Sequence, residues 1–470
     1  MITFQDFSRA DNKTKWLQSA LISYRNSSEY RQAKEEEAYM AGRNTAIMEF
    51  QRMIYDMAGL PETNFAAANT KIRNRLIHRL VTDRCSYSLG NGISFAGKRR
   101  EKNAAGETVT VDATKEILGN RFDNAVYQWA YWAQGNGAAY LYVHIGHERD
   151  EWEYTLFKKT EFLPLYDEQT GALRGGVRFW SLDWGKRPIQ AVLYLEEGYI
   201  KYRTPEKKYG VNALEQDGDL HPYIETVETS EAFGEEVTGT GNLTMLPIFP
   251  LYSGENRDSA LDNLKPLIDA YDLILSGFCN DLQDCAQVYW LISGAMGMTA
   301  AQKRELMDRL LLQHMAVIDG ENSRIEPYTQ EIPYNARAEA LTQIRNQIYE
   351  NWGGFDVHTI EAGSTNDHIE AGYWPMDEEA DAFEYQMITS IQMILQMMGI
   401  DDVPLFVRNR VSNQLEQTQM VMYAAAQLDD RTILEKLPWI TVDEVDEILA
   451  RKDAQNAGML EPDEDDDLNE

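Results

Sequence analysis

The sequence predicts an α+β protein, because the period of its apolar residues changes along the chain. Over residues 14–60, and again through most of the second half, apolar residues recur at the three- and four-residue spacing of helices. Between about residues 139 and 202 they alternate with polar residues, as in short strands with one buried face. A chain of 470 residues is long enough for roughly two or three domains, each with its own core.

The first half is expected to begin with helices and continue with strands. Helices are predicted over residues 14–60, over 69–89, where Gly90-Asn91-Gly92 ends the pattern, and over 123–134. Alternation predicts strands over residues 139–145, 152–158, 161–166, 176–182, 191–195, 199–202 and 246–252. The acidic, glycine-rich residues 209–242 are predicted to form a surface loop.

The second half is expected to be mainly helical. Helices are predicted over residues 259–286, 299–312, 335–352, 377–398, 412–428, 430–437 and 442–450, with a hairpin or strand pair over 317–328. Residues 355–375 have no steady period and contain Gly363 and Gly372, so they are predicted to be a loop. The last ten residues include seven acids and are expected to be a disordered tail.

The charge balance is strongly acidic. The chain has 44 Lys and Arg against 76 Asp and Glu, a formal net charge of −32. Tight binding of DNA depends on basic residues that neutralise phosphates, so this composition argues against a clamp on DNA. It is compatible with a channel through which DNA slides without sticking. Solubility alone is an equally good explanation of the charge.

Cysteines and apolar runs bear on the location of the protein. Cys85, Cys279 and Cys285 have no Cys-x-x-Cys spacing, which argues against a disulfide framework or a zinc site and favours synthesis in a reducing cytoplasm. The first ten residues do not resemble a signal peptide, and no apolar run approaches the ~20 residues of a membrane span. No membrane partner is expected.

Motifs for nucleotide or metal chemistry are weak or missing. The sequence has neither a phosphate-binding loop nor a G-x-G-x-x-G fingerprint after a strand, so no cofactor and no ATP hydrolysis are expected. His144 and His147 are three apart at the end of a predicted strand, on opposite faces, and are interpreted as surface residues. An acidic run could instead form a two-metal carboxylate site, although acids at a helix start more often complement the helix dipole: Asp377, Glu378, Glu379, Asp381 and Glu384.

The helix predicted from residue 259 carries two stripes. The apolar stripe follows alternating three- and four-residue spacing: Leu261, Leu264, Ile268, Tyr271, Leu275, Phe278 and Leu282. A separate acidic stripe lies about 110° away: Asp258, Asp262, Asp269 and Asp272. Pro266 either kinks the first turns or marks the start of the helix. An ordinary half-buried helix explains this pattern, and so does a helix packed beside copies of itself around a charged channel.

From this segment the sequence resembles the portal proteins of tailed bacteriophages, of the siphophage type. The resemblance is carried by the apolar strand 245–252 and by Leu267-Ile-Asp-Ala-Tyr-Asp272, Ser276 and Asn280-Asp281 in the following helix. Other stretches agree in order: Tyr39 with Gly42-Arg43-Asn44, residues 74–95, residues 135–143 with 162–167, residues 406–410, Glu416, and residues 432–447. The family's G-N-x-S-G-x-A stretch is missing from residues 360–375, so the tunnel loop is placed there by order and composition.

The resemblance implies the portal fold, with an α/β wing, a helical stem, a small α/β clip and a helical crown. The wing would be residues 1–258 with 399–411. The stem helices would be 259–285 and 335–355, on either side of a clip at 286–334. A tunnel loop and its helix would occupy 356–398, and a crown with the acidic tail 412–470.

The resemblance also implies function and partners. The protein would form a homo-oligomeric ring of about twelve copies at one capsid vertex of the virion, assembled in the host cytoplasm, as the channel for packaging and ejecting double-stranded DNA. Terminase large subunit and then the head-tail adaptor would dock on the clip, and scaffold and major capsid proteins would contact the wing and crown.

The resemblance assigns candidate residues to three surfaces. Tunnel-loop residues facing DNA would be Glu361, Ser364, Thr365, Asn366, Asp367, His368 and Glu370. The channel face of the stem would carry Asp262, Asp269, Asp272, Arg337 and Arg345. Docking of partners on the clip would use Lys303, Arg304 and Arg309.

Two other classes stay open at this point. A metal-dependent enzyme acting on nucleic acid would cleave it through the acidic run at 377–384. An acidic monomeric interaction protein would form no ring, so particle mass separates it from a portal.

Overall fold

A computed structural model of the chain contains two compact units. Unit 1 comprises Met1–Val81, Trp129–Tyr142 and Thr155–Trp352, and unit 2 comprises Thr82–Gln128, Val143–Tyr154 and Gly353–Glu470. The structure describes residues 2–55, 59–64, 67–97, 99–102, 108–146, 151–181, 189–205, 208, 210–230, 234–285, 289–293, 299, 301–302, 304–305, 324–328, 334–356, 366–410, 414–437, 440, 445 and 448–452.

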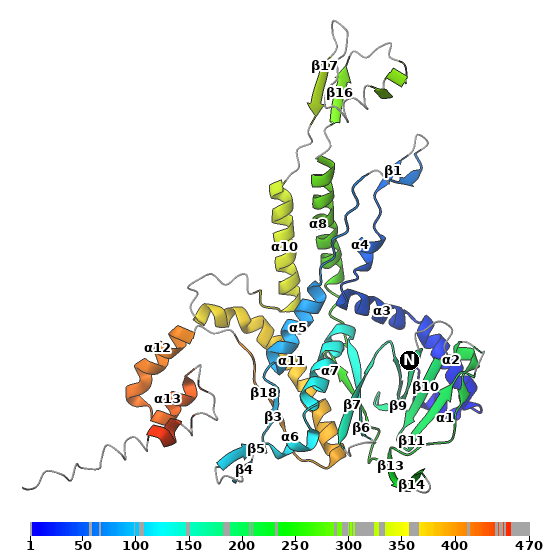
Figure 1. The fold of residues 1–470 in the computed structure, drawn as a ribbon, viewed down its shortest axis with the longest axis vertical. Coiled ribbons are helices and arrows are strands. Elements are labelled where there is room, and N and C mark those ends of the chain that lie inside the picture. The colour runs from blue at the N-terminus through cyan, green and yellow to red at the C-terminus, as the bar shows by residue number, and fades with distance from the viewer. Residues whose placement is uncertain are drawn as a thin grey trace, which may run out of the picture. The chain divides into compact units, whose positions relative to one another are not determined.

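Helices and strands are both well represented, which confirms the predicted α+β class (Figure 1). The helices are α1(Phe4–Arg9), α2(Lys13–Asn26), α3(Ser28–Met40), α4(Thr45–Glu49), α5(Leu76–Leu89), α6(Ala113–Leu118), α7(Phe122–Asn136), α8(Lys265–Cys285), α10(Tyr334–Trp352), α11(Asn366–Met398), α12(Gln414–Ala424) and α13(Asp430–Lys436), with 3-10 turns at Val211–Ala213 and Ala425–Gln427. The strands are β1(Met53–Tyr55), β2(Pro61–Thr63), β3(Ile93–Phe95), β4(Arg99–Lys102), β5(Thr108–Val111), β6(Ala138–Ile145), β7(Trp152–Lys158), β8(Phe162–Tyr166), β9(Leu173–Ser181), β10(Ile189–Leu195), β11(Gly198–Arg203), β12(Glu215–Gln216), β13(Ile224–Ser230), β14(Gly234–Gly241), β15(Ile248–Tyr252), β16(Tyr289–Ser293), β17(Arg324–Tyr328) and β18(Pro404–Phe406).

The helical pattern at the N-terminus divides into separate helices at polar caps. The Asn12 side chain accepts the Lys15 N–H at 2.9 Å and starts α2, and the Ser27 hydroxyl accepts the Tyr30 N–H at 3.1 Å and starts α3. Such side-chain acceptors satisfy N–H groups that have no partner inside the helix. The helical pattern predicted over residues 14–60 is therefore divided into α2, α3 and α4, with the first break at Ser27.

A five-stranded antiparallel sheet in unit 1 has the order β12-β11-β10-β9-β8. Helices α1 and α2 cover one face of it (Figure 1), where Phe7, Leu17 and Leu21 join Leu193 and Tyr202 in one buried cluster. The alternation that predicted these strands reflects this arrangement, since only one side of each strand faces the helices.

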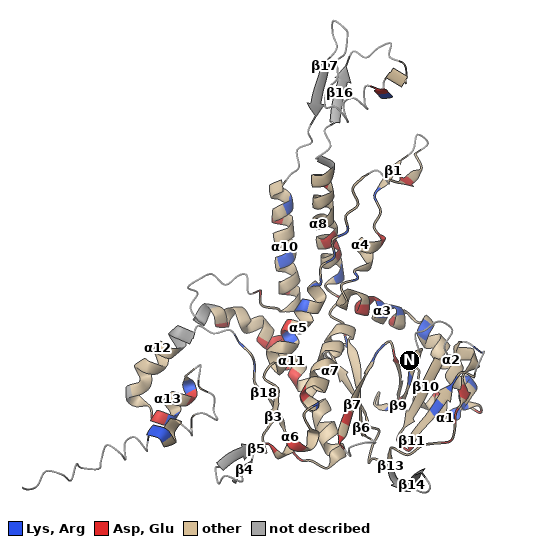
Figure 2. Cartoon of the chain, in the orientation of Figure 1, with Lys and Arg blue, Asp and Glu red and all other residues tan. Residues whose placement is uncertain are grey.

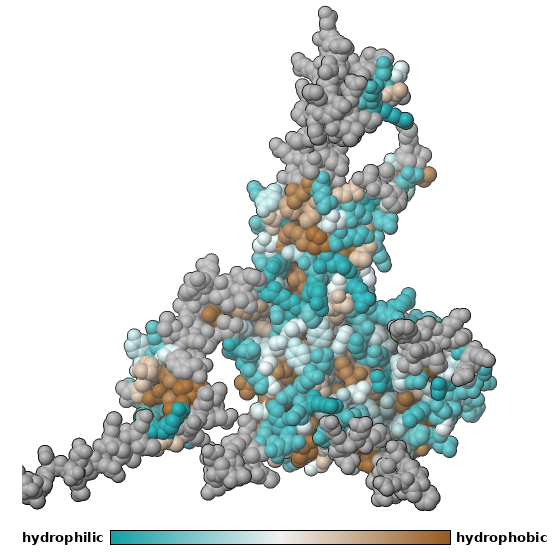
Figure 3. Space-filling model, in the orientation of Figure 1, coloured by the Kyte–Doolittle hydropathy of each residue, from teal (hydrophilic) through white to brown (hydrophobic). Residues whose placement is uncertain are grey.

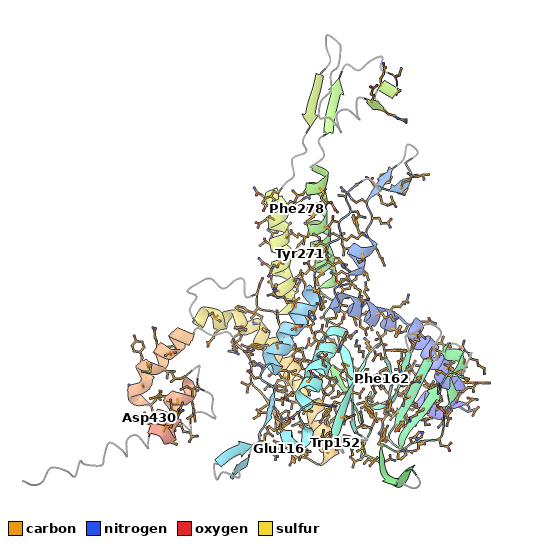
Figure 4. The ribbon with its side chains drawn as sticks, in the orientation of Figure 1. Glu116, Trp152, Phe162, Tyr271, Phe278 and Asp430 are labelled. Carbon is orange, nitrogen blue, oxygen red and sulfur yellow. The ribbon has the colours of Figure 1, made fainter. Side chains whose placement is uncertain are left out.

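A second sheet has the order β15-β6-β7. Strand β15 pairs antiparallel with β6, with Ile248 opposite Tyr142, although they are about a hundred residues apart in the chain. Buried aromatic side chains fill the core on this side, including Tyr140, Phe157 and Phe162, which Figure 4 labels. The Tyr140 and Phe162 rings lie 4.6 Å apart between centroids.

Helices α8 and α10 run side by side in unit 1 (Figure 1). Pro266 is the second residue of α8, where its missing N–H costs no helical hydrogen bond, so it marks the start of the helix. Gly353 follows α10 with φ 62°, a conformation that favours glycine and ends the helix as predicted. Strands β16 and β17, between α8 and α10 in sequence, pair with each other, with Ile292 opposite Ile325.

Unit 2 is built around the long helix α11. Its apolar residues Tyr373, Met376 and Ala380 form a buried cluster with Tyr87. Pro375 lies inside the helix, and the α11 ribbon changes direction along its length (Figure 1), as expected where a proline removes a helical hydrogen bond. Strand β18 pairs antiparallel with β3, with Leu405 opposite Ser94.

Some predicted elements were wrong. Residues 50–60, predicted helical, include β1, and residues 70–74, also predicted helical, precede α5 without helical structure. Residues 209–242, predicted to be a loop, contain the β13–β14 hairpin. Within 317–328, predicted to form a hairpin or strand pair, residues 324–328 form β17, which pairs with β16, and residues 317–323 lie outside the described residues. The predicted loop 355–375 is helical from Asn366.

In the described part of the chain, no helix is long and apolar enough to span a bilayer.

Candidate functional site

A polar ladder on α8 binds the backbone of residues 70–74 in unit 1. The Asn280 Oδ1 accepts the Thr70 N–H at 2.6 Å, and the Ser276 hydroxyl accepts the Ile72 N–H at 3.0 Å. Asp272 Oδ1 accepts the Asn74 N–H at 3.3 Å and the Asn74 Nδ2 at 2.7 Å. We call Asp272, Ser276 and Asn280 the polar ladder.

The ladder works because two periodicities match. Residues four apart on a helix are separated by about 6 Å along its axis, and residues two apart on an extended chain by about 6.6 Å. Ladder positions four apart therefore meet every second residue of the 70–74 segment, which runs antiparallel to α8. The three ladder side chains are buried, and this binding explains why residues 70–74 do not continue α5 as a helix.

Asp272 is the buried end of the ladder. It has no exposed surface, and besides Asn74 it accepts the Nδ2 of Asn44. Burial raises the pKa of Asp272, and the amide donors partly offset that shift. One turn earlier, Asp269 accepts the Tyr39 hydroxyl at 2.5 Å and the Lys265 ammonium at 2.8 Å.

The predicted channel face of the stem is only partly available in the protomer. Asp272 cannot line a channel, because it is fully buried against residues 44 and 74; that prediction was wrong. Asp269 is half-buried against Tyr39, whereas Asp262 is exposed and accepts Gln32 Nε2 at 2.6 Å. The second half of the acidic stripe, Asp269 and Asp272, therefore forms internal contacts of unit 1, whereas Asp258 and Asp262 are exposed.

The predicted basic residues of the stem lie on α10, and acidic residues lie on α8 (Figure 2). Arg337 is half-buried, with Nη2 at 2.5 Å from Asp281 Oδ2 on α8. Arg345 is also half-buried, with its guanidinium 5.6 Å from the centre of the Tyr349 ring. Arg337 thus joins the two helices through Asp281, which Arg52 also contacts.

The apolar stripe of α8 changes environment along the helix. Leu261, Leu264 and Ile268 are buried, but the stripe becomes half-buried further on, and Leu282 is 50% exposed. Figure 4 shows Tyr271 and Phe278 on the side of α8 that faces α10, and the Phe278 ring lies 5.6 Å from that of Tyr334. The far half of the stem pair therefore retains apolar surface in the protomer.

In unit 2, Arg408 is held by three carboxylates of α11. Arg408 Nη1 lies 2.8 Å from Asp377 Oδ1, Nη2 lies 3.0 Å from Glu384 Oε2, and Nη2 also contacts Asp381. Positions 377, 381 and 384 share one helix face, so one guanidinium reaches all three. We call this group the Arg408 clasp.

Arg410 and Tyr87 extend the clasp. Arg410 Nη2 lies 2.5 Å from Asp377 Oδ1, and the Tyr87 hydroxyl donates to the same oxygen at 2.6 Å. Burial, together with the hydrogen bond to Asp377, raises the pKa of Tyr87 to about 12. Although burial opposes it, the Tyr87 and arginine contacts lower the pKa of Asp377.

The clasp removes the basis of the carboxylate-site alternative. Asp377, Asp381 and Glu384, which could have formed a two-metal site, bind arginine side chains instead. Within the described residues, no group of three or more His, Cys, Asp and Glu side chains is arranged to hold a metal ion. The acids are structural partners of residues 408 and 410.

The remaining predicted residues are only partly described. Asn366, Asp367, His368 and Glu370 belong to α11, not to a loop, and Glu370 is exposed. Arg304 is also exposed. His144 is half-buried, and its Nδ1 lies 3.5 Å from the Ile145 carbonyl oxygen. Outside the described residues lie Glu361, Ser364, Thr365, Lys303, Arg309 and His147.

Sequence reasoning did not anticipate the partners of the ladder and the clasp. Tyr39, Asn44 and Asn74 were noted only within stretches resembling portal proteins, and Arg408 and Arg410 only within residues 406–410. One sequence signal could have indicated these contacts. Polar side chains able to form hydrogen bonds occur in the stretches with Tyr39, Asn44, Asn74, Arg408 and Arg410, and also in residues 267–281 and in the acidic run of α11. The structure brings the first set together on α8 and the second on α11.

Comparisons with known proteins agree with this arrangement of motifs. Residues 20–458 match the family described as "Phage portal protein, SPP1 Gp6-like". The portal protein of Clostridium phage phiCD119 is 24% identical over 401 residues, covering 81% of this chain and 83% of the relative. The portal protein of Bacillus phage SPP1 is 22% identical over 453 residues, covering 89% and 84%.

Solved structures with a similar chain include two gene transfer agent particles. One, the neck of an empty particle computed with C6 symmetry, has a TM-score of 0.41 and 11% identity, covering 76% of this chain and 87% of that chain. The other, the virion of a native particle, has a TM-score of 0.43 and 10% identity, covering 88% and 97%. Because the family match spans nearly the whole sequence, the chain belongs to the SPP1 Gp6-like phage portal proteins, which are non-enzymatic structural proteins of the virion capsid that serve DNA packaging.

Proposed function

We propose that this portal protein assembles into a closed ring of about twelve copies at one vertex of the capsid, with a central channel for DNA. The match to the portal family over residues 20–458 carries this proposal. The surface of the protomer supports it, because apolar side chains of the stem pair stay exposed where a monomer would bury them: Leu282 on α8 and Tyr334 on α10. Figure 3 shows hydrophobic (brown) surface over these helices.

The regions of the ring follow the order of the chain. We propose a wing from residues 1–258 with 399–411, a stem from 259–285 and 335–355, and a clip from 286–334 between the stem helices. Residues 356–398 would provide the tunnel loop and its helix, and residues 412–470 the crown. The pairing of β18 with β3 supports the assignment of 399–411 to the wing, because it places residue 405 beside residue 94.

Double-stranded DNA is the proposed passenger during packaging and ejection. The net charge of −32 and the exposed Glu370 support a channel of low affinity, because a duplex surrounded by like charge has no deep electrostatic well along its path. Translocation needs this property, since every phosphate clamp would have to break at each step. Asp262, Asp269 and Arg345 remain candidates for the channel face of the stem.

The proposed protein partners are those that act at a portal vertex. Terminase large subunit would dock on the clip during packaging and the head-tail adaptor afterwards, through a surface that includes Lys303, Arg304 and Arg309. Scaffold and major capsid proteins would contact the wing and crown. The exposed position of Arg304 is compatible with this docking.

Particle mass and imaging test the ring. Purified full-length chain should have a native mass about twelve times that of the subunit, and negative-stain images should show rings with a central hole. A chain that stays monomeric at high concentration, across a series of salt concentrations and with its scaffold present, would refute the proposal.

A further inference from the structure

In the part of unit 1 that the structure describes, several exposed large apolar side chains are concentrated within residues 48–63, which we call the arm. It leaves α4, forms the β1–β2 hairpin, and then leads back toward the segment bound by the polar ladder (Figure 1). Among the described side chains of the arm, five large apolar ones are exposed: Met48, Phe50, Met53, Tyr55 and Leu60. Tyr55 is 74% exposed and Leu60 62% exposed. Exposed apolar side chains concentrated in one segment are typical of an interaction site.

The base of the arm is firmly attached to its own protomer. Arg52 donates to the Ala68 carbonyl at 3.1 Å and lies 3.6 Å from Asp281 on α8, and the Asn64 N–H donates to the Arg52 carbonyl at 2.8 Å. The ladder then fixes residues 70–74. These contacts hold the base of the arm to the protomer, while Met53, Tyr55 and Leu60 stay exposed.

The hairpin itself is short. Strands β1 and β2 pair over three residues each, from Met53 opposite Thr63 to Tyr55 opposite Pro61. An isolated two-stranded hairpin is marginally stable in water and usually needs packing against another surface. A fixed base with an exposed apolar hairpin is the arrangement of a docking element that acquires its packing on assembly.

A complementary surface lies on the same unit. The far part of the stem pair carries an apolar strip formed by Leu275, Phe278 and Leu282 of α8 with Tyr334 of α10. Leu282 is 50% exposed and Tyr334 is 61% exposed. Positions 275, 278 and 282 share one face of α8 because they are three and four residues apart.

Ring symmetry requires two such surfaces on each copy. In a closed ring of more than two subunits each contact is head-to-tail. Each protomer therefore contacts one neighbour through one surface and the other neighbour through a different surface. The arm and the apolar strip are two different surfaces, each with exposed apolar side chains, and the Arg52–Asp281 ion pair joins the base of the arm to the helix that bears the strip. We propose that the arm of each copy docks on the apolar strip of the neighbouring copy; this inference rests on the proposed ring.

Assembly of a polar-arm variant tests the inference. In the full-length chain, Met53→Ser, Tyr55→Ser and Leu60→Ser together should raise the concentration for half-assembly at least tenfold, without lowering the melting temperature of the unassembled chain. A matched triple variant outside the arm, Ile117→Ser, Leu220→Ser and Val403→Ser, also removes exposed apolar side chains and should assemble at the wild-type concentration. Wild-type assembly by the arm variant, from a chain that does form rings, would overturn the inference and leave the proposed ring intact. A wild-type chain that forms no ring would instead reject both.

Photo-cross-linking identifies the receiving surface. A p-benzoylphenylalanine in place of Tyr55 should give covalent dimers on denaturing gels from assembled rings but not from unassembled chain. The cross-linked peptides should include residues 272–285 or 334–352. Cross-links only within one chain, to another region of the neighbour, or to a scaffold or capsid protein would each overturn the assignment.

Discussion

The Ser276 hydroxyl on α8 accepts the backbone N–H of Ile72 at 3.0 Å and lies 3.4 Å from the carbonyl oxygen of the same residue. Asn280 contacts both backbone groups of Thr70 in the same way, through Oδ1 and Nδ2. Backbone groups that would be paired within a helix or sheet are paired here with side chains, so the ladder replaces secondary structure for residues 70–74. Amide hydrogen exchange can measure the protection that each ladder side chain gives to its backbone partner.

Ser276→Ala should increase the hydrogen-exchange rate of the Ile72 amide about tenfold, because loss of one hydrogen bond of about 1.4 kcal/mol shifts local opening by that factor. Thr342→Ala on α10 is the control, since that exposed hydroxyl donates to the Ala338 carbonyl of its own helix. Unchanged exchange at Ile72 in Ser276→Ala would show that the ladder does not hold the segment.

Asp272 should make stability depend on pH. Its folded-state pKa is raised by burial, so between the ordinary value of 3.8 and the raised value the folded chain binds more protons than the unfolded chain. Its contribution is therefore fully present below pH 3.8 and is lost as pH rises through the folded pKa. The melting temperature of wild type relative to Asp272→Asn should fall over that range and then level off. A difference that is constant with pH would contradict the assignment.

Asp272→Ala should destabilise the chain by about 2–3 kcal/mol at neutral pH, because Asn44 Nδ2 would lose one of its two acceptors and the Asn74 N–H would lose its carboxylate partner in a buried place. Denaturant unfolding of unassembled chain measures this loss. Asp217→Ala, at an exposed position, is the control and should stay within about 0.5 kcal/mol of wild type.

Arg408→Ala should lower the stability of unit 2 by about 2 kcal/mol, because Asp377, Asp381 and Glu384 would repel each other without the guanidinium. The loss stays below that of a fully buried pair because Asp381 is exposed. Arg174→Ala removes the exposed pair with Glu196 and should cost less than about 1 kcal/mol. Equal effects of the two variants would show that the clasp is an ordinary surface pair.

Replacing Glu361, Asp367 and Glu370 with lysine should leave the ring assembled but slow or stall packaging, more so at low salt, where screening is weak. The triple variant Glu168→Lys, Asp217→Lys and Asp219→Lys makes the same charge change at exposed positions elsewhere and should package normally. Normal packaging by the first variant at low ionic strength would mean that these residues lie away from the DNA, and the tunnel assignment would fail.

Pure rings should not hydrolyse ATP, because the portal family to which the chain belongs is a family of non-enzymatic structural proteins. A separate terminase would then supply the energy of packaging. Phosphate release by the ring fractions should stay at the level measured with buffer alone. Turnover that follows the ring through successive purification steps would contradict this prediction.

Much of the fold could be predicted from the sequence. Alternation located β6 and β7 to within one residue, and helical spacing located α7 and α10 with similar accuracy, because these elements bury one regular face. The ordered motifs predicted the portal family, which the match over residues 20–458 confirms, and with it the non-enzymatic role. The ring, its regions and its partners stay predictions.

What the sequence by itself determined was the class, the family and the elements whose periodicity records a single buried face. Only the tertiary structure decided the state of residues 70–74, the burial of Asp272 and the partners of Asp377. Each of these depends on contacts between segments some 30 to 290 residues apart: the ladder pairs 280 with 70, and Asp377 pairs with both 408 and 87. Local pattern carries no information on such contacts, because the spacing that makes Asp272 look solvent-facing on an isolated helix is unchanged when amide donors from distant segments bury it.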